Sequence, residues 1–243
     1  MNFNKIQQTF DNYVHNFDLN NKEIKLKYEH TLEVSNLCLE IAKRMKLSKE
    51  DQDLAKLIGY LHDIGRFEQI KQFNTYKDTI FDHADNGIRL LFDKGLIRSF
   101  IAIDKYDDII RKAVKNHNKY EIIDELNERE KLFANIIRDS DKIDNFRVHI
   151  KYYEDIIKDV PSKEIIDCFY EHKCVLLKDI KNKTDAILCT MAFIFDINYK
   201  ESLELLRENG YFKQFINSIK VNDKNKELFK ELEKIVYEKL GEQ

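Results

Sequence analysis

Proline and glycine are scarce in this chain of 243 residues, which contains one proline and six glycines. These two residue types end helices and form tight turns, so their scarcity favours long regular segments. Lys, Glu, Leu and Ile, which favour helices, are abundant, and 43% of the residues are hydrophobic, which suffices for a sizeable core. The composition therefore predicts an all-α fold of many helices joined by polar loops.

Long apolar runs and basic blocks are also missing. No run of 18 apolar residues occurs, and the N-terminal stretch MNFNKIQQTF has no apolar signal core, so we expect a soluble, cytoplasmic protein with no membrane association. The 41 basic and 44 acidic residues are interspersed and give a net charge of −3. This balance argues against a dedicated DNA- or RNA-binding role.

The chain has no CxxC pair. Its four cysteines, Cys38, Cys168, Cys174 and Cys189, are far apart or unsuitably spaced, and each lies among apolar residues of a predicted helix. We therefore expect reduced, buried thiols at all four positions. A zinc site built from these cysteines is not expected.

Apolar residues recur at helical spacing through the first half of the chain. Helices are predicted at residues 22–46, 50–64, 81–95, 104–117 and 128–146. Gly65 is predicted to end the second of these helices as its C′ residue. The polar and aromatic segment from Arg66 to Phe81 is predicted to be a loop.

The second half of the chain is amphipathic but has few residues suited to catalysis. We predict a catalytic helical domain at residues 1–148, with its core at about 22–147, and a C-terminal helical extension at 149–243 that packs on the domain or caps it. Helices are predicted near residues 149–158, 162–178, 183–196, 199–208 and 222–239, with breaks at Pro161 and Gly210.

Several ionisable residues lie on or beside the apolar stripes of the predicted helices. They are His30, His62, Asp63, His83, His117 and Asp141. Imidazole nitrogens and carboxylate oxygens are good ligands for divalent iron, manganese, nickel or zinc. Helical bundles build metal sites by directing such side chains from separate helices into the interior.

A structural explanation exists for each of these residues alone. A single histidine on an apolar face is more often a hydrogen-bonded core residue, and Asp63 or Asp141 could cap a helix. Four of the chain's seven histidines share the pattern, however, and each would need its own buried partner. A shared metal satisfies them together. The other three, His15, His149 and His172, lie in polar or charged stretches and are interpreted as surface or supporting residues.

The order of these residues resembles the signature of the HD-domain metal-dependent phosphohydrolases, His…His-Asp…Asp. It falls on His30, His62-Asp63 and Asp141. The stretch YEHTLEVSNLCLEIA is similar to the family's first helix, GYLHDIGR to its HDIG core, and IIRDSDKID to the helix with the last aspartate. The resemblance covers residues 26 to about 147 and implies a helical-bundle fold.

Two further histidines match a branch of this superfamily with six ligands. DHADNGIRLL and AVKNHN place His83 and His117 between the HD pair and the last aspartate. Branches with this order hold two metals and include HD-GYP-type and membrane-anchored HD cyclic-dinucleotide phosphodiesterases and HD-type diadenosine tetraphosphate hydrolases. The GYP triplet is absent and Arg66 replaces the usual lysine, so HD-GYP activity itself is not expected.

The resemblance implies a role for each matched residue. His30, His62, Asp63 and Asp141 would hold one metal, His83 and His117 a second, and Asp63 would bridge the two. A hydroxide between the metals would be the nucleophile. With a single metal, His83 and His117 would instead hydrogen-bond the substrate, and His117 could pass a proton to the leaving group.

Residues beside the signature are candidates for substrate contacts. Arg66 suits a phosphate oxygen, or it forms a structural ion pair with Asp63 or Glu68. Lys142 could touch phosphate, and Asp144 could orient a ligand. In the loop predicted after Arg66, the aromatics Phe67, Phe73 and Tyr76 either line a substrate pocket or anchor the loop in the core.

The resemblance implies hydrolysis of a phosphoester or phosphoanhydride bond in a small phosphorylated substrate, most simply a nucleotide. A phosphomonoester, a cyclic dinucleotide and a dinucleoside polyphosphate all fit. The expected cofactors are divalent metals, two per chain, drawn from Fe, Mn, Ni and Zn, with Mg also compatible. The alternatives are a di-iron oxygenase of the same superfamily and a module that senses a nucleotide without turning it over.

Overall fold

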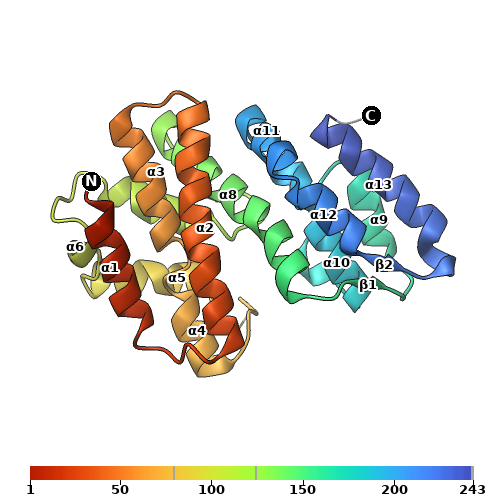
Figure 1. Cartoon of the computed structure of the whole chain (residues 1–243), viewed down its shortest axis with the longest axis horizontal. Coiled ribbons are helices and arrows are strands. Elements are labelled where there is room, and N and C mark those ends of the chain that lie inside the picture. The colour runs from red at the N-terminus through yellow and green to blue at the C-terminus, as the bar shows by residue number, and fades with distance from the viewer. Residues whose placement is uncertain (79, 124, 242–243) are drawn as a thin grey trace. The chain divides into compact units, whose positions relative to one another are not determined.

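The computed structural model describes residues 1–78, 80–123 and 125–241, and helices dominate it (Figure 1). The all-α fold is therefore confirmed. The described residues leave out Thr79, Asp124, Glu242 and Gln243. Thr79 falls within the loop predicted at 66–81, and Glu242 and Gln243 fall within the extension predicted at 149–243, so these parts of the two predictions lie outside the described residues. No helix in the described part of the chain is long and apolar enough to cross a membrane.

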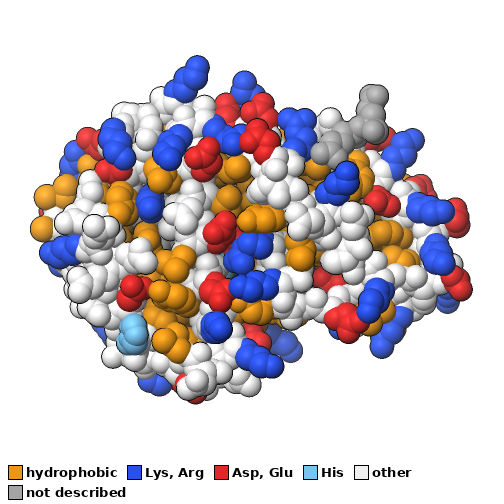
Figure 2. Space-filling view, in the orientation of Figure 1, with side chains coloured by type: hydrophobic (Ala, Val, Ile, Leu, Met, Phe, Trp, Pro, Cys, Tyr) orange, Lys and Arg blue, Asp and Glu red, His pale blue; other side chains and the backbone are white. Residues whose placement is uncertain are grey.

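The chain divides into two compact units, Met1–Asp141 and Lys142–Gln243. The division falls inside one helix, earlier than the boundary predicted at residue 148. Whether the C-terminal residues cap the catalytic domain stays a prediction. Basic and acidic side chains are intermixed on the face drawn in Figure 2, as the interspersed charges of the sequence indicate.

The first unit consists of helices that the sequence largely predicted. They are α1 (Phe3–Val14), α2 (Lys22–Arg44), α3 (Lys49–Leu61), α4 (Arg66–Phe73), α5 (His83–Ile88), which continues as a π-helical turn (Arg89–Asp93), α6 (Ile97–Phe100), α7 (Asp107–Asn116) and the start of α8 (Glu128–Tyr152). Polar N-cap residues precede the helices α2, α3 and α5. Asn21 caps α2, Ser48 caps α3 and Asp82 caps α5, each through a side-chain oxygen that accepts backbone N–H groups.

Helices α2 and α3 lie side by side (Figure 1) and approach each other closely at Gly59. A Cβ atom at Gly59 would lie 2.5 Å from the Cα atom of Ser35. The absence of a side chain at this position therefore lets the two backbones pack together. This contact sets the distance between the α2 and α3 residues that form the site described below.

Helix α1 was not predicted, because the N-terminal segment is mostly polar. Only Ile6, Phe10 and Val14, at four-residue steps, are buried. Phe10 stacks on Tyr28 of α2 with 5.8 Å between ring centroids and contacts Phe67 of α4 edge-on at 5.9 Å. A narrow apolar stripe thus suffices to hold α1 on α2 and α4.

The loop predicted from Arg66 to Phe81 was wrong in its first half, which forms α4. Phe67 and Ile70 are buried on one face of this helix, and the polar Arg66 and Gln69 are buried as well. A short helix with two apolar anchors and two buried polar residues has no clear amphipathic pattern. Its tertiary contacts, rather than its periodicity, determine it.

Gly65 does not end α3 as a left-handed C′ residue. Helix α3 ends at Leu61, and the backbone at Gly65 has φ −76°, in the right-handed region. A Cβ atom at Gly65 would lie 2.2 Å from the carbonyl oxygen of His83 and 2.5 Å from the amide nitrogen of Gly87. Glycine is therefore required here because α5 crosses directly over it.

The second unit contains the rest of α8, the strands β1 (Ile156–Ile157) and β2 (Lys220–Val221), and a set of short helices. The helices are α9 (Lys163–Tyr170), the 3₁₀ turn Leu177–Asp179, α10 (Lys183–Met191), the 3₁₀ turn Ala192–Asp196, α11 (Lys200–Asn209), α12 (Tyr211–Ser218), the 3₁₀ turn Asp223–Asn225 and α13 (Lys226–Leu240). The two strands pair in parallel. Phe146 packs edge-on against Phe212, with 5.0 Å between ring centroids, in the core of this unit.

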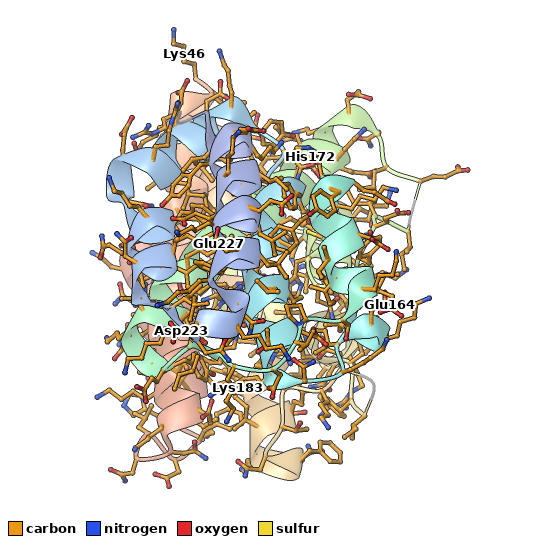
Figure 3. The ribbon with its side chains drawn as sticks, turned by 90° about the vertical axis from the view of Figure 1, so that its right-hand side faces the viewer. Lys46, Glu164, His172, Lys183, Asp223 and Glu227 are labelled. Carbon is orange, nitrogen blue, oxygen red and sulfur yellow. The ribbon has the colours of Figure 1, made fainter. Side chains whose placement is uncertain are left out.

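Two helix predictions in this unit were wrong in extent. The segment 149–158 is the end of α8 followed by β1, and the helix predicted at 162–178 ends at Tyr170. Glu164 lies in the first turn of α9, and the exposed His172 lies beyond its end with a left-handed φ of 54° (Figure 3). Helix α12 was missed, although the break at Gly210, which has φ +68°, is confirmed.

All four cysteines are free. Cys38 and Cys189 are buried as predicted, and burial raises the pKa of each thiol to about 12. Cys168 and Cys174 are partly exposed, which corrects the expectation of four buried thiols. Cys174 follows the end of α9 and therefore lies outside the helix in which the sequence placed it.

We predict that Gly65→Ala destabilises the protein by about 1–3 kcal/mol, because the added methyl group collides with the backbone of α5. The matched control is Gly87→Ala, where the nearest atom to an added Cβ lies at 3.4 Å. Alanine favours helices over glycine, so this variant should be neutral or more stable by up to about 1 kcal/mol. Urea unfolding measures both. Equal stability of the two variants would contradict the close approach at Gly65.

Candidate metal centre

The six residues singled out in the sequence come together inside the first unit. His30 lies on the buried face of α2, and Asp141 lies on α8. His62 and His117 are the C-cap residues that directly follow α3 and α7, Asp63 is next to His62, and His83 begins α5. All four histidines and Asp63 are buried. Five helices therefore direct their polar side chains to one place.

The first cluster lies between α2, α3 and α8. The Nε2 atom of His30 is 3.0 Å from Oδ1 of Asp141 and 3.4 Å from Nε2 of His62. The Nε2 atom of His62 is 4.0 Å from the same oxygen of Asp141. The three donor atoms thus surround one point, as the ligands of a single ion do.

The second cluster joins α5 and α7. The Nε2 atoms of His83 and His117 are 2.9 Å apart. These atoms lie 3.1 Å and 3.6 Å, respectively, from Oδ1 of Asp63. Two imidazoles and one carboxylate oxygen therefore face a second point.

Asp63 connects the two clusters through its two oxygens. Its Oδ2 atom lies 3.6 Å from Nε2 of His30 and 3.5 Å from Nε2 of His62, whereas Oδ1 faces His83 and His117. A carboxylate can bridge two ions in this way because each oxygen binds separately. Each oxygen of Asp63 thus faces a different cluster, so Asp63 would be able to contribute a ligand atom to both.

The hydrogen bonds of the outer ring nitrogens define which atoms face the centre. Nδ1 of His62 donates to the carbonyl oxygen of Gly59 at 2.8 Å, and Nδ1 of His117 donates to that of Val114 at 2.6 Å. A carbonyl oxygen only accepts, so these Nδ1 atoms carry the protons and the neutral rings present Nε2 lone pairs inward. Facing lone pairs repel each other unless a cation lies between them. The donor set therefore fits divalent metal ions.

The electrostatics of the centre keep its ligands in the forms that bind metals. Burial opposes the ionisation of Asp63, but the charge of Lys27 and the neighbouring His62 and His117 hold its pKa well below the ordinary value. Burial likewise opposes the ionisation of Asp141, and His30 holds the pKa of that carboxyl below its usual range. Burial lowers the pKa of His117 to about 4. Carboxylates and a neutral imidazole thus coexist at neutral pH.

Comparison with known protein families identifies the fold of this unit. A family model for the HD domain matches residues 28–146. The chain contains a domain of the HD superfamily. Searches of curated proteins and of solved structures gave no match. Members of this superfamily are generally metal-dependent hydrolases, and the matched residues include the whole cluster from His30 to Asp141. The HDIG subtype and the role of each ligand stay predictions.

Lys27 is a residue of the HD domain centre that the sequence reasoning missed. Its Nζ atom lies 2.8 Å from Oδ2 of Asp63, and its side chain is 12% exposed. Lys27 stands one turn before His30 on α2 and therefore shares the inward face of that helix. Its spacing from His30 could have revealed it, but a lysine at this spacing is usually a solvated residue.

Asp78 was also missed. Its Oδ1 atom accepts from Nδ1 of His83 at 2.7 Å, and burial, which opposes ionisation, is outweighed by His83 and Arg66, so the pKa of Asp78 lies below its usual range. Metal-binding histidines commonly donate to such a carboxylate. That rule predicts an acidic hydrogen-bond partner for His83, but the sequence alone does not show whether the partner is Asp78 or Asp85.

Arg66 lies at the edge of the centre and is 8% exposed. One terminal nitrogen contacts Oδ1 of Asp78 at 3.0 Å, and the other lies 3.0 Å from Nε2 of His83. Its Nε atom is 3.8 Å from Oδ1 of Asp63 and has no hydrogen-bond partner among the described residues. The predicted ion pair with Asp63 is present. Contact with phosphate stays a prediction.

Two other predicted substrate contacts belong to the second unit. Lys142 pairs with Asp196 at 2.7 Å, and Asp144 pairs with Arg147, with 2.9 Å between Oδ2 and the nearer terminal nitrogen. These ion pairs are structural contacts that the sequence did not predict. The proposed roles of Lys142 and Asp144 toward a substrate stay predictions.

The three aromatic residues considered as pocket lining have different positions. Phe67 is fully buried in the aromatic core, and Phe73 is 45% exposed and packs on Phe81. Tyr76 lies beside the centre, where its ring contacts Lys27 and Arg66. Of the remaining histidines, His15 and His172 are exposed, and His149 bonds Asp155 in the second unit.

We predict that Asp63→Ala removes most of the bound metal, because both clusters lose an oxygen ligand. Metal per chain is measured by inductively coupled plasma mass spectrometry after anaerobic loading with manganese or iron. Asp155→Ala is a matched control, because Asp155 is also a buried aspartate paired with a histidine, at 2.8 Å from His149. This control should keep the wild-type metal content. Full metal content in Asp63→Ala would refute the bridging assignment.

Proposed function

We propose that this HD-domain protein is a metal-dependent phosphohydrolase that cleaves a phosphoester or phosphoanhydride bond in a small phosphorylated compound, most simply a nucleotide. The observation that carries the proposal is the division of the Asp63 oxygens between two histidine clusters. A pair of ions bridged by one carboxylate is suited to phosphoryl transfer. With a single ion, His83 and His117 would act only toward the substrate, and the approach of Asp63 Oδ1 to both of them would not be used for metal binding.

The distances within the two clusters support a proposed division of the ligands between two ions. His30, His62, Asp63 and Asp141 would hold one ion, and Asp63, His83 and His117 the other. Such ions supply a water molecule of lowered pKa as nucleophile and positive charge for the phosphoryl oxygens. Iron, manganese, nickel and zinc all accept this mixture of imidazole and carboxylate, and magnesium is also compatible.

Two cations of the chain flank Asp63 and would bind the phosphate. Lys27 contacts Oδ2 and Arg66 faces Oδ1. Once the carboxylate oxygens ligate ions, they no longer neutralise these side chains fully. A phosphate group offers both cations several acceptor oxygens at once, and charge-assisted hydrogen bonds of this kind are among the stronger ones in proteins.

The pattern of exposure supports a small substrate. The histidines are buried, whereas the side chains of Asp141, Lys27 and Asp78 are 19%, 12% and 21% exposed. A phosphate end can approach along these three residues. The small exposed fractions of these described side chains suit the end of a small phosphorylated compound.

The decisive experiment loads the protein with manganese, iron, nickel, zinc or magnesium and tests a panel of phosphorylated compounds. The panel contains aryl phosphates, nucleoside monophosphates, cyclic dinucleotides and dinucleoside polyphosphates. We expect product release with at least one of them. Stoichiometric oxygen uptake with a substrate would instead indicate a di-iron oxygenase. Nucleotide binding without turnover and with less than about one ion per chain would indicate a sensing module.

We predict that Lys27→Met lowers kcat/KM for the best substrate about tenfold or more, because one charge-assisted hydrogen bond to phosphate is lost. Bound metal should stay unchanged. Lys25→Met, on the exposed side of the same helix, is the control and should match the wild type. Wild-type kinetics in Lys27→Met would mean that this lysine has only a structural role.

A further inference from the structure

Tyr76 occupies a defined position at the edge of the metal centre. It lies in the segment between α4 and α5, and its ring centroid is 5.7 Å from Nζ of Lys27 and 5.6 Å from Cζ of Arg66. Its hydroxyl donates to Glu23, and its carbonyl oxygen accepts from Arg66 at 3.1 Å. One aromatic side chain therefore contacts both cations that flank Asp63.

The ring is not needed to fix the segment that carries it. Nε2 of Gln69 donates to the carbonyl oxygen of Phe81 at 2.6 Å and to that of Lys77 at 3.3 Å. Asn118 donates to Asp78 at 3.2 Å. These bonds already attach the segment to α4 and to the residues after α7. The partly exposed ring of Tyr76 also lies outside the aromatic core around Phe67.

The ring of Tyr76 would reduce the repulsion between Lys27 and Arg66 when metal ions are bound to Asp63. Lys27 and Arg66 both contact Asp63, which partly neutralises each of them. With ions on Asp63, the two cations would repel each other and the ions. The negative face of an aromatic ring attracts both cations and adds no net charge that would repel a phosphate.

The hydroxyl of Tyr76 also contacts Glu23 on the same helix as Lys27. Glu23 and Lys27 are four residues apart on α2 and so lie on the same face of that helix. The hydroxyl of Tyr76 bonds the first, and the ring contacts the second. The side chain is thus tied to α2 at one end and to Arg66 of α4 through its own backbone.

We propose that Tyr76 is a positioning residue whose ring holds Lys27 and Arg66 as a pair that receives the phosphate group of the substrate. This inference rests on the proposed function, because it assigns the two cations to phosphate. It concerns the substrate side of the centre and not the metal ligands. It also identifies which of the aromatic residues in this segment serves the site.

The test compares three variants of the full chain loaded with manganese. Tyr76→Leu removes the ring, Tyr76→Phe keeps the ring and removes the bond to Glu23, and Phe73→Leu removes a neighbouring ring that contacts neither cation. The first readout is the dissociation constant of inorganic phosphate by isothermal titration calorimetry. The second is kcat and KM for the best substrate, and the third is metal content.

We expect Tyr76→Leu to bind phosphate about tenfold more weakly, which corresponds to the loss of two cation–π contacts. Its KM should rise by a similar factor while kcat changes less than about threefold. Tyr76→Phe and Phe73→Leu should stay within about twofold of the wild type. All three variants should keep their metal, because none of the substitutions changes one of the six candidate metal ligands.

Several results would overturn the proposal. Unchanged phosphate binding in Tyr76→Leu would remove the positioning role, and so would equal losses in Tyr76→Phe and Tyr76→Leu, which would make the hydroxyl the active group. A loss confined to nucleotides, with phosphate unaffected, would place the base on the ring instead. Loss of metal in Tyr76→Leu would make the residue a support of the ion centre.

The proposed function and this inference fail in different ways. Phosphate binding that follows the expected order without turnover of any compound would refute the hydrolase and leave the role of Tyr76 standing. Turnover with a phosphate affinity that does not depend on Tyr76 would do the reverse.

Discussion

The carboxylate of Asp63 is the group around which the first unit is organised. A buried charge of this kind is costly unless other groups compensate it. Here the compensation comes from every side, from histidines on α2, α3, α5 and α7 and from Lys27 and Arg66. The helices that supply these groups must therefore meet at one point, and that requirement sets how closely they pack.

The close packing depends on two glycines. At Gly59 the backbone of α3 touches that of α2, and at Gly65 the backbone touches α5. The first contact places His62 beside His30, and the second places His83 beside Asp63. The chain has few glycines, and these two lie where two backbones need to touch.

The sequence predicted the metal-binding cluster more fully than its surroundings. His30 and Asp141 follow apolar residues at three- and four-residue steps on two long helices, and the adjacent His62 and Asp63 form a motif, so pattern alone could find them. Lys27 and Asp78 act through contacts that cross the fold, and a lysine or an aspartate at such positions is common in any polar segment. Helices α1 and α4 were not predicted for a related reason, since each depends on a few aromatic contacts that form only in the folded state.

The contact between Gly65 and α5 also bears on how mutations in this protein would be interpreted. A substitution at Gly65 would displace the carbonyl oxygen of His83, the first residue of α5, and with it the imidazole that faces Asp63. In a scan of single substitutions, this position would behave like a metal ligand. It would do so without any side chain, since what it contributes to the centre is empty space.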